Sequence, residues 1–155
     1  MFEVAPDLRL QASGDMEPLD PTLEAEVEHL WQAAKRDRKL FNGRVFCADR
    51  IEPARLEGHW TEYRRAVAQI AKPALWPRLR IRSLAVCGVL RCRDGVALGR
   101  REARSVYQAG EWQLPPAGSV DASAAEPGGV SWQRALLGEL HEEVGIAKEA
   151  VHSLR

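Results

Sequence analysis

The segment between Ser131 and Gly145 places the strongest constraint on the fold, because it carries the signals of a complete helix. Ser131 is suited to cap the helix at its start, and Gly145 is suited to end it in a left-handed conformation. Apolar residues at helical spacing are expected to face the interior: Ala135, Leu136, Leu140 and Val144. Any fold of this chain must therefore bury one face of this helix.

Three glutamates of the same helix are expected to share a face. Glu139, Glu142 and Glu143 stand at positions i, i+3 and i+4. Where such a face is partly buried, each pair of like charges costs about 3 kcal/mol. A hard divalent cation removes this repulsion, because Mg²⁺ and Mn²⁺ prefer carboxylate oxygens and keep waters for substrate phosphates. The spacing predicts a Mg²⁺ or Mn²⁺ site, and the alternative is a solvated acidic helix face.

The composition narrows the class of protein. Of the 155 residues, 45% are hydrophobic and the formal net charge is zero, which suits one compact core and gives no general attraction to nucleic acid or membrane. No apolar run approaches the ~20 residues that span a bilayer, and no signal peptide is visible.

The three cysteines, Cys47, Cys87 and Cys92, lie in apolar, strand-like runs and are expected to be buried, reduced thiols. We predict a cytoplasmic protein, and a homodimer is compatible with the sequence.

Charge is distributed unevenly along the chain. Residues 1–30 hold eight acids and one base, whereas residues 76–104 hold eight arginines and two acids. Two interpretations of the arginines stay open, because such a stretch either contacts phosphate or forms solvated strand edges. Arg100 and Arg101 are the candidates for phosphate contact.

The remaining sequence predicts an α+β chain. In residues 1–80 we expect a strand at Val4–Leu10, a helix that Asp20 caps and Pro21 begins, and strands at Arg44–Ile51 and Leu56–Trp60. A second helix, capped by Thr61, is expected to extend through Ala71. Farther on we expect a buried central strand at Ser83–Cys92, a turn at Asp94-Gly95, a returning strand at Val96–Arg101 and a flexible insertion at 121–130. Lys72–Arg80 is the expected boundary between an N-terminal lobe, 1–80, and a second domain, 81–155.

A strand hairpin, a Pro-Pro-Ala-Gly loop ending at Gly118 and a helix ending Glu-Leu-His-Glu-Glu-Val-Gly-Ile occur together. In combination they resemble the Nudix hydrolases, whose sequence box ends R-E-U-x-E-E-x-G-U, with U an aliphatic residue. The matching residues are Glu139, Leu140, Glu142, Glu143, Gly145 and Ile146. The resemblance covers residues 81–146 and implies a Nudix-type mixed sheet with flanking helices, preceded by a small α/β lobe. That lobe more loosely resembles the N-terminal lobe of Nudix proteins related to UDP-sugar hydrolases.

The sequence departs from the family pattern in two ways. Gly138 stands where the family has arginine, and Gly118 lies 21 residues before Glu139, farther than the pattern places its loop glycine. No glutamate occupies the first glutamate position of the box, so the usual brace between loop and helix is missing. The chain also ends nine residues after Ile146, whereas a Nudix domain continues well past its helix. We therefore expect either a fragment or a domain that a partner chain completes.

The resemblance implies hydrolysis of a nucleoside diphosphate linked to another moiety, such as a sugar, by attack of water on phosphorus with Mg²⁺ or Mn²⁺. Glu139, Glu142 and Glu143 would then bind metal ions, and Glu139 or Glu143 would act as the catalytic base.

The substrate would be a small nucleoside diphosphate derivative. We expect the protein to bind neither nucleic acid nor a membrane. Gly118 would let the backbone approach its diphosphate, and Arg100 or Arg101 would pair with a phosphate oxygen.

Two other functions stay open. Gly138 and the long loop favour a non-catalytic Nudix-like module that binds a nucleotide or a partner. An unrelated α/β domain with a solvated acidic helix is the second alternative.

Overall fold

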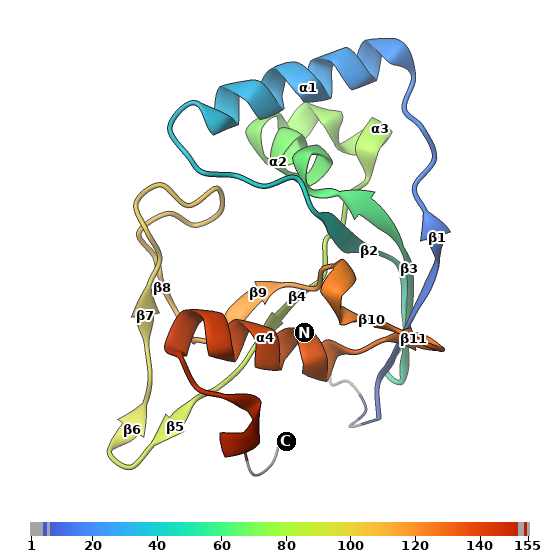
Figure 1. Ribbon diagram of the computed structural model, residues 1–155. Helices are drawn as coiled ribbons and strands as arrows, with labels where there is room; N and C mark the ends of the chain where they lie inside the picture. The colour runs from blue at the N-terminus through green and yellow to red at the C-terminus, as the bar shows by residue number, and fades with distance from the viewer. Residues whose placement is uncertain (1–4, 6, 152–153, 155) are drawn as a thin grey trace.

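The computed structural model describes residues 5, 7–151 and 154, which form an α+β architecture (Figure 1). This part of the chain has four α-helices: α1 (Pro21–Lys35), α2 (Tyr63–Ala71), α3 (Trp76–Leu79) and α4 (Trp132–Val144). The main sheet consists of β1 (Arg9–Asp15), β2 (Arg44–Ile51), β3 (Arg55–Glu62), β10 (Ala125–Glu126) and β11 (Gly129–Val130). Shorter strands form separate pairs: β4 (Ala85–Cys87), β5 (Arg91–Cys92), β6 (Gly95–Val96), β7 (Gly99–Arg100), β8 (Trp112–Gln113) and β9 (Ala117–Ser119). Single turns of 3₁₀-helix are η1 (Pro73–Leu75), η2 (Ala122–Ala124) and η3 (Lys148–Ala150).

The main sheet is mixed, with the strand order β10-β11-β1-β3-β2. β1 runs parallel to β3, and the other neighbours are antiparallel. In the β2–β3 pair Phe46 lies opposite Trp60, and the two rings meet edge to face with centroids 5.7 Å apart. A Cβ on Gly58 would lie 2.1 Å from the Cys47 carbonyl oxygen and 2.6 Å from Phe46 Cζ. The pairing therefore requires glycine at this position.

β2 is hydrogen-bonded along both edges and joins the two halves of the sequence. One edge pairs with β3. On the other edge the Phe46 amide donates to the Val120 carbonyl at 2.8 Å, and the Leu84 amide donates to the Phe46 carbonyl at 2.9 Å. The Ala48 amide also donates to the Arg82 carbonyl at 2.9 Å. These bonds fix the chain on either side of the β4–β9 pair and so position that pair against the sheet.

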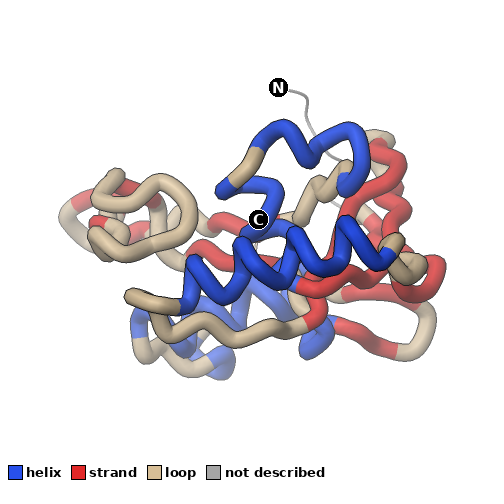
Figure 2. Tube along the Cα trace, turned by 90° about the horizontal axis from the view of Figure 1, so that it is seen from above, coloured by secondary structure: helices blue, strands red, loops and turns tan. Residues whose placement is uncertain are grey.

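Two apolar clusters fill the interior. One includes Leu10, Phe46, Ala48, Leu56, Trp60, Val120, Ala124, Val130 and Ala135, and so lies between the main sheet and α4. The other includes Leu23, Val27, Cys47, Ala66, Ala68, Leu75, Leu79 and Ile81, under α1 and α2. Figure 2, seen from above, shows the loops and short strands of the β5–β8 region standing to one side of the helices. None of the described helices is both long and apolar enough to cross a bilayer.

Several local signals of the sequence are confirmed. The Asp20 side chain caps α1 by accepting a hydrogen bond from a first-turn amide at 3.0 Å. Ser131 caps α4 by accepting from the Arg134 amide at 3.2 Å. Gly145 ends α4 with a φ of 74°, in the left-handed region. The bounds of β2 are those predicted, Arg44–Ile51.

The expectation of a buried central strand at Ser83–Cys92 is wrong. Its middle forms only β4, which pairs with β9 alone, and Arg91–Cys92 pairs with β6. Cys87 and Cys92 are consequently exposed, whereas Cys47 in β2 is buried as predicted. An apolar run is buried on both sides only where other elements cover both faces of its strand. In the described residues, this stretch has too few neighbours to provide that cover.

Three further expectations need correction. Residues 121–130, which we expected to form a flexible insertion, contain regular structure: Asp121 caps η2, and Val130 of β11 pairs with Leu10 of β1. Thr61 belongs to β3 and does not cap α2. The strand expected at Val4–Leu10 begins at Arg9, as β1, and Val4 lies outside the described residues.

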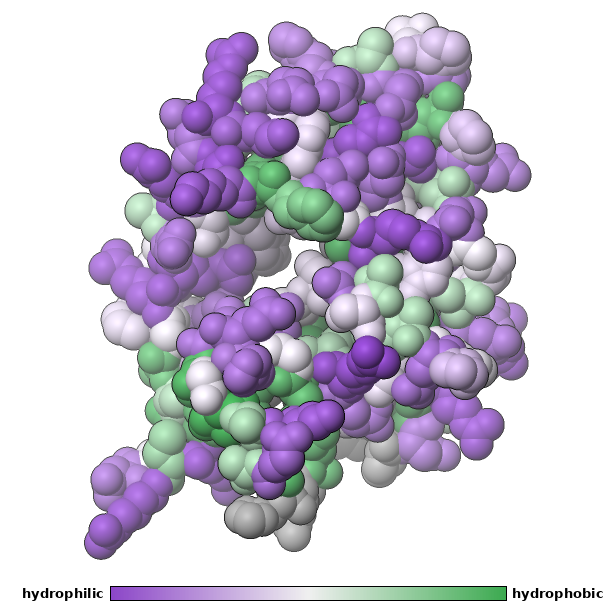
Figure 3. Space-filling model, viewed as in Figure 1, coloured by the Kyte–Doolittle hydropathy of each residue, from purple (hydrophilic) through white to green (hydrophobic). Residues whose placement is uncertain are grey.

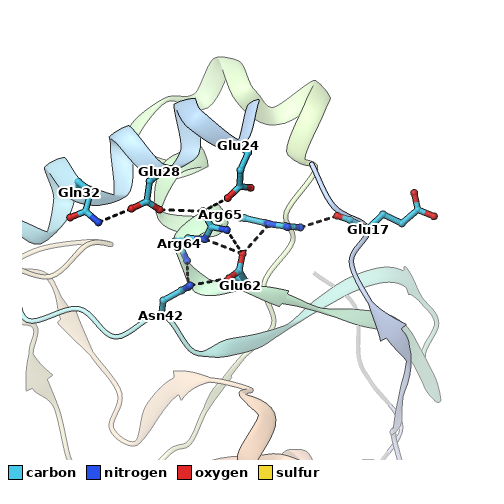
Figure 4. A network of polar contacts seen from close by, with 8 residues as sticks. All are labelled: Glu17, Glu24, Glu28, Gln32, Asn42, Glu62, Arg64 and Arg65. Atoms are coloured by element: carbon cyan, nitrogen blue, oxygen red, sulfur yellow. Dashed lines mark hydrogen bonds and ion pairs between the residues drawn. The ribbon is translucent and has the colours of Figure 1, made fainter. Parts of the chain in front are cut away.

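A network of ion pairs around Arg64 ties α1 to β3 and α2 (Figure 4). The guanidinium lies 2.5 Å from Glu24 and 3.3 Å from Glu28 on α1, and 2.6 Å from Glu62 at the end of β3. Asn42 donates to Glu62 at 3.1 Å and accepts from the Arg64 amide at 2.9 Å. The Arg64 side chain is only 14% exposed, so these pairs are shielded from water more than ordinary surface pairs.

The network also sets a pH dependence. Partial burial tends to raise the pKa of Glu62, but the hydrogen bond and charge of Arg64, aided by Asn42 and Arg65, outweigh it and hold this pKa below its usual value. A carboxyl with a depressed folded pKa stabilises fully above its unfolded pKa of about 4.3, and this contribution is lost as pH falls through the folded pKa. The network therefore stabilises the protein at neutral pH and weakens in acid.

Replacing Arg64 with Met is expected to lower the free energy of unfolding by about 2–3 kcal/mol, because three glutamates are left together without their cation. The control is Arg55→Met, which removes a surface arginine with a 53% exposed side chain and is expected to change that free energy by less than about 0.5 kcal/mol. Urea unfolding followed by tryptophan fluorescence measures both variants. Equal losses in the two variants would contradict the role given to Arg64.

Candidate functional site

The contact between α4 and β9 fixes the first of the predicted carboxylates. A Cβ on Gly118 of β9 would lie 1.8 Å from Glu139 Oε1. Because Gly118 has no side chain, the Glu139 carboxylate can lie directly against the backbone of β9. The predicted loop glycine and the predicted glutamate are neighbours in space, although 21 residues separate them in the sequence.

Glu143 lies one turn farther along α4 and is held by the same strand. Its Oε2 accepts a hydrogen bond from the Ala117 amide at 3.0 Å. Glu142 is exposed, and so is His141 between the glutamates. Across residues 5, 7–151 and 154, no group of three His, Cys, Asp or Glu side chains is close enough to hold a metal ion by itself. The structure thus brings Glu139 and Glu143 to β9. Glu139 is partly buried there, whereas Glu142 and Glu143 are both exposed.

The surroundings of Glu139 disfavour its charged form. Burial contributes most, and the charges of Glu143, Glu142 and Asp121 add to it, so that the pKa of Glu139 is raised to about 7. Within the described part of the chain, none of these four carboxylates takes part in an ion pair. The site is therefore a concentration of negative charge that its own protein neighbours leave unbalanced.

The oxygen atoms of these carboxylates are of the kind that hard divalent cations prefer as ligands. Mg²⁺ is usually bound through one or two carboxylates, while waters and substrate phosphates fill its other positions. Glu139 and Glu143 supply such a pair from α4, where both contact β9, and Asp121 adds a third charge that acts on Glu139. The repulsion that keeps the pKa of Glu139 high is the repulsion that a cation would remove.

A cavity of about 590 Å³ reaches one of these carboxylates, Glu143, and includes both predicted arginines in its lining. Arg100, Arg101 and Glu143 all contribute to its wall. Arg100 Nε donates to the Gly110 carbonyl and Arg101 Nε to the Tyr107 carbonyl, each at 2.9 Å. These bonds leave several of the five donors of each guanidinium for a ligand. Figure 3 shows the surface hollowed at its centre, between α4 below and the helices above.

Two parts of the site were missed by sequence reasoning. Asp121 is held in place because its side chain accepts a hydrogen bond from the Ser123 amide at 2.8 Å. An Asp two residues before a Ser is a typical local turn signal, so Asp121 was detectable had the segment been taken as structured. The Ala117 amide, in contrast, leaves no signal in the sequence, because its partner lies on a distant helix.

Replacing Glu139 with Gln is expected to stabilise the metal-free protein by about 1–2 kcal/mol near pH ~8.5 and to change it little near pH ~4. The sign follows from the raised pKa. In the unchanged protein, the ionised Glu139 carboxylate destabilises the fold. This destabilisation is absent below the unfolded pKa of about 4.3, grows as pH rises and is complete above the folded pKa of about 7. Thermal unfolding in the presence of a chelator measures it.

The control for this prediction is Glu126→Gln on the exposed strand β10, which removes the same charge. We expect it to shift the free energy of unfolding by less than about 0.5 kcal/mol at both pH values. A Glu139→Gln effect that does not grow with pH would contradict the environment described for Glu139.

Comparisons of the chain with models of protein families, with curated proteins and with solved structures give no match. The site is therefore defined by the packing of α4 on β9, by the arginines beside it and by the sequence motif.

Proposed function

We propose that this protein is a Mg²⁺-dependent hydrolase that cleaves a nucleoside diphosphate linked to another moiety, with a nucleotide sugar as one such substrate, by attack of water on phosphorus. The observation that carries the proposal is the environment of Glu139. Its partly buried carboxyl has a pKa raised to about 7 by burial and by neighbouring carboxylates, and it has no ion-pair partner among the described residues. Carboxylates that can bind a cation, beside arginines that can bind phosphate, are what phosphoryl transfer to water needs.

Glu139 and Glu143 would hold the cation against β9, and Glu142 would contribute from the exposed side of the same helix. When bound, the cation would neutralise charge on the diphosphate and favour ionisation of a water molecule. The bond between Glu143 and the Ala117 amide orients that carboxylate from the strand side. Gly118 keeps the space for the Glu139 carboxylate free of a side chain.

The arginines would hold the substrate. Arg100 and Arg101 line the cavity next to Glu143, and their planar guanidinium groups suit bidentate contact with phosphate oxygens. Their existing bonds to the Gly110 and Tyr107 carbonyls limit the orientations of both side chains. Such prior orientation reduces the entropy lost when a ligand binds.

Glu139 is better suited than Glu143 to accept the proton of the attacking water. A general base is most effective when its pKa lies near the working pH. Burial is the largest cause that raises the pKa of Glu139, and a bound cation would remove only the part that comes from the neighbouring carboxylates. Glu143, in contrast, uses one oxygen to accept the Ala117 amide bond. If Glu139 is the base, its substitution by Gln lowers kcat far more than it weakens metal binding, whereas a pure metal ligand shows both losses.

A second candidate function is a non-catalytic module that binds a nucleotide or a partner. The observation that favours it is the exposure of Glu142, together with the lack of three converging metal-ligand side chains in the described part of the chain. Gly138 in place of the family arginine points in the same direction. This function predicts nucleotide binding that does not depend on a divalent cation.

The test is a panel of nucleoside diphosphate derivatives, incubated with the protein and about 5 mM Mg²⁺. We expect turnover with Mg²⁺ and none with a chelator. Glu139→Gln and Glu143→Gln are each expected to lower kcat/KM at least about 100-fold, because each removes a charge that acts only when substrate and cation are bound. Glu149→Gln, an exposed glutamate outside α4, is the control and should retain activity.

Mn²⁺ affinity, measured by electron paramagnetic resonance, separates the two functions. The hydrolase predicts that Glu143→Gln weakens Mn²⁺ binding at least about tenfold. Folded protein that turns over no member of the panel, yet binds nucleotide equally well with and without Mg²⁺, would instead identify the non-catalytic module.

A further inference from the structure

A second cavity, of about 780 Å³, lies between the end of α1 and the loop that follows β7. Six basic residues contribute to its lining: Lys35, Arg36, Arg38, Lys39, Arg101 and Arg104. Two acids, Asp37 and Glu102, also line it, so cations outnumber carboxylates three to one. The chain as a whole has no net charge, which makes this concentration of positive charge a local feature.

The two segments that form this cavity are held together. Arg38 Nε donates to the Arg104 carbonyl at 2.8 Å, which links the chain after α1 to the loop after β7. Figure 1 shows that loop rising beside the end of α1. Tyr63 lines the cavity between them. Burial raises the pKa of Tyr63, while the charges of Arg101 and Arg38 act in the opposite direction, as expected when both cations lie near its phenol group.

Among the described residues, the six cations of this lining have no acidic partner, whereas most arginines of residues 1–80 that lie outside the lining do. Arg44, Arg50, Arg55, Arg64, Arg65 and Arg78 all form ion pairs. In the described part of the chain, none of the six lining cations does. The C-terminal end of α1 favours nearby cations by its partial negative charge. That preference accounts for basic residues at the end of α1 itself, but not for the placing of Arg101 and Arg104 beside them by a different segment.

We propose that this cavity binds an anion carrying several contiguous phosphates, as in inorganic polyphosphate or a nucleoside polyphosphate. A single phosphate engages few of six cations spread around about 780 Å³ of space, whereas a chain of phosphates reaches both segments. The inference goes beyond the proposed hydrolysis and does not depend on it. The two cavities share Arg101, Glu102 and Ser105, but none of the α4 glutamates lines this one, whereas Glu143 lines the other.

The experiment is titration calorimetry of the whole chain with sodium tripolyphosphate in a chelator, so that the proposed metal site plays no part. The variant is Lys39→Gln with Arg104→Gln, two exposed cations of the cavity lining, one from each segment. The control is Arg91→Gln with Arg93→Gln, two exposed arginines that are not part of that lining. Both double variants lose the same charge, and thermal unfolding checks that each is folded.

We expect tripolyphosphate binding to weaken at least about tenfold in the cavity variant and less than about twofold in the control. We also expect affinity for the unchanged protein to fall steeply between about 50 and 200 mM salt. Binding of a nucleoside triphosphate at similar strength would assign the recognition to the phosphates, which supports the proposal.

Three results would overturn the proposal. The first is no binding of tripolyphosphate at low salt. The second is equal weakening in both double variants, which indicates general attraction by net charge. The third is a preference for a different anion: orthophosphate that competes as well as tripolyphosphate, or a short oligothymidylate that binds at least about tenfold more tightly, which indicates single-stranded nucleic acid.

Discussion

The hydrogen bonding of β2 along both edges is the constraint on which the other features of this structure depend. One edge aligns β3 and, through Glu62 and Arg64, the two long helices of the N-terminal half. The other edge receives the chain at Leu84 and Val120 and so places β9 against α4. The carboxylate site therefore owes its position to a strand that contributes no side chain to it. Because backbone bonds of this kind are nearly independent of side-chain identity, the same sheet can carry very different sites.

Local signals predicted the helices well and the sheet poorly. Asp20, Ser131 and Gly145 act within a few residues of their own position, so their caps are encoded directly in the sequence. Burial of Ser83–Cys92 depends instead on which elements cover it, and hydrophobicity alone gives no information about that. Arg44–Ile51 was predicted with the correct bounds because its apolar run coincides with real cover from both apolar clusters.

The candidate site divides in the same way. The helix that carries the three glutamates was predictable from local signals, but the spacing of the glutamates did not show that Glu139 and Glu143 contact β9 while Glu142 makes no such contact. That Glu139 contacts Gly118, that Glu143 meets a strand amide and that Asp121 adds its charge all depend on tertiary packing. The two cavities meet at the segment beginning with Arg101, which follows β7. This short segment is the part of the surface where carboxylate chemistry and cationic recognition are closest.

The contact at Gly58 has a consequence for how this protein can vary. A methyl group there would meet a backbone carbonyl and the ring of Phe46, and neither can move without separating β2 from β3. Since both halves of the molecule are assembled on that pair, a change at Gly58 would affect every surface of the protein at once. In an inherited variant, damage at this position would reduce the amount of folded protein rather than alter any one activity.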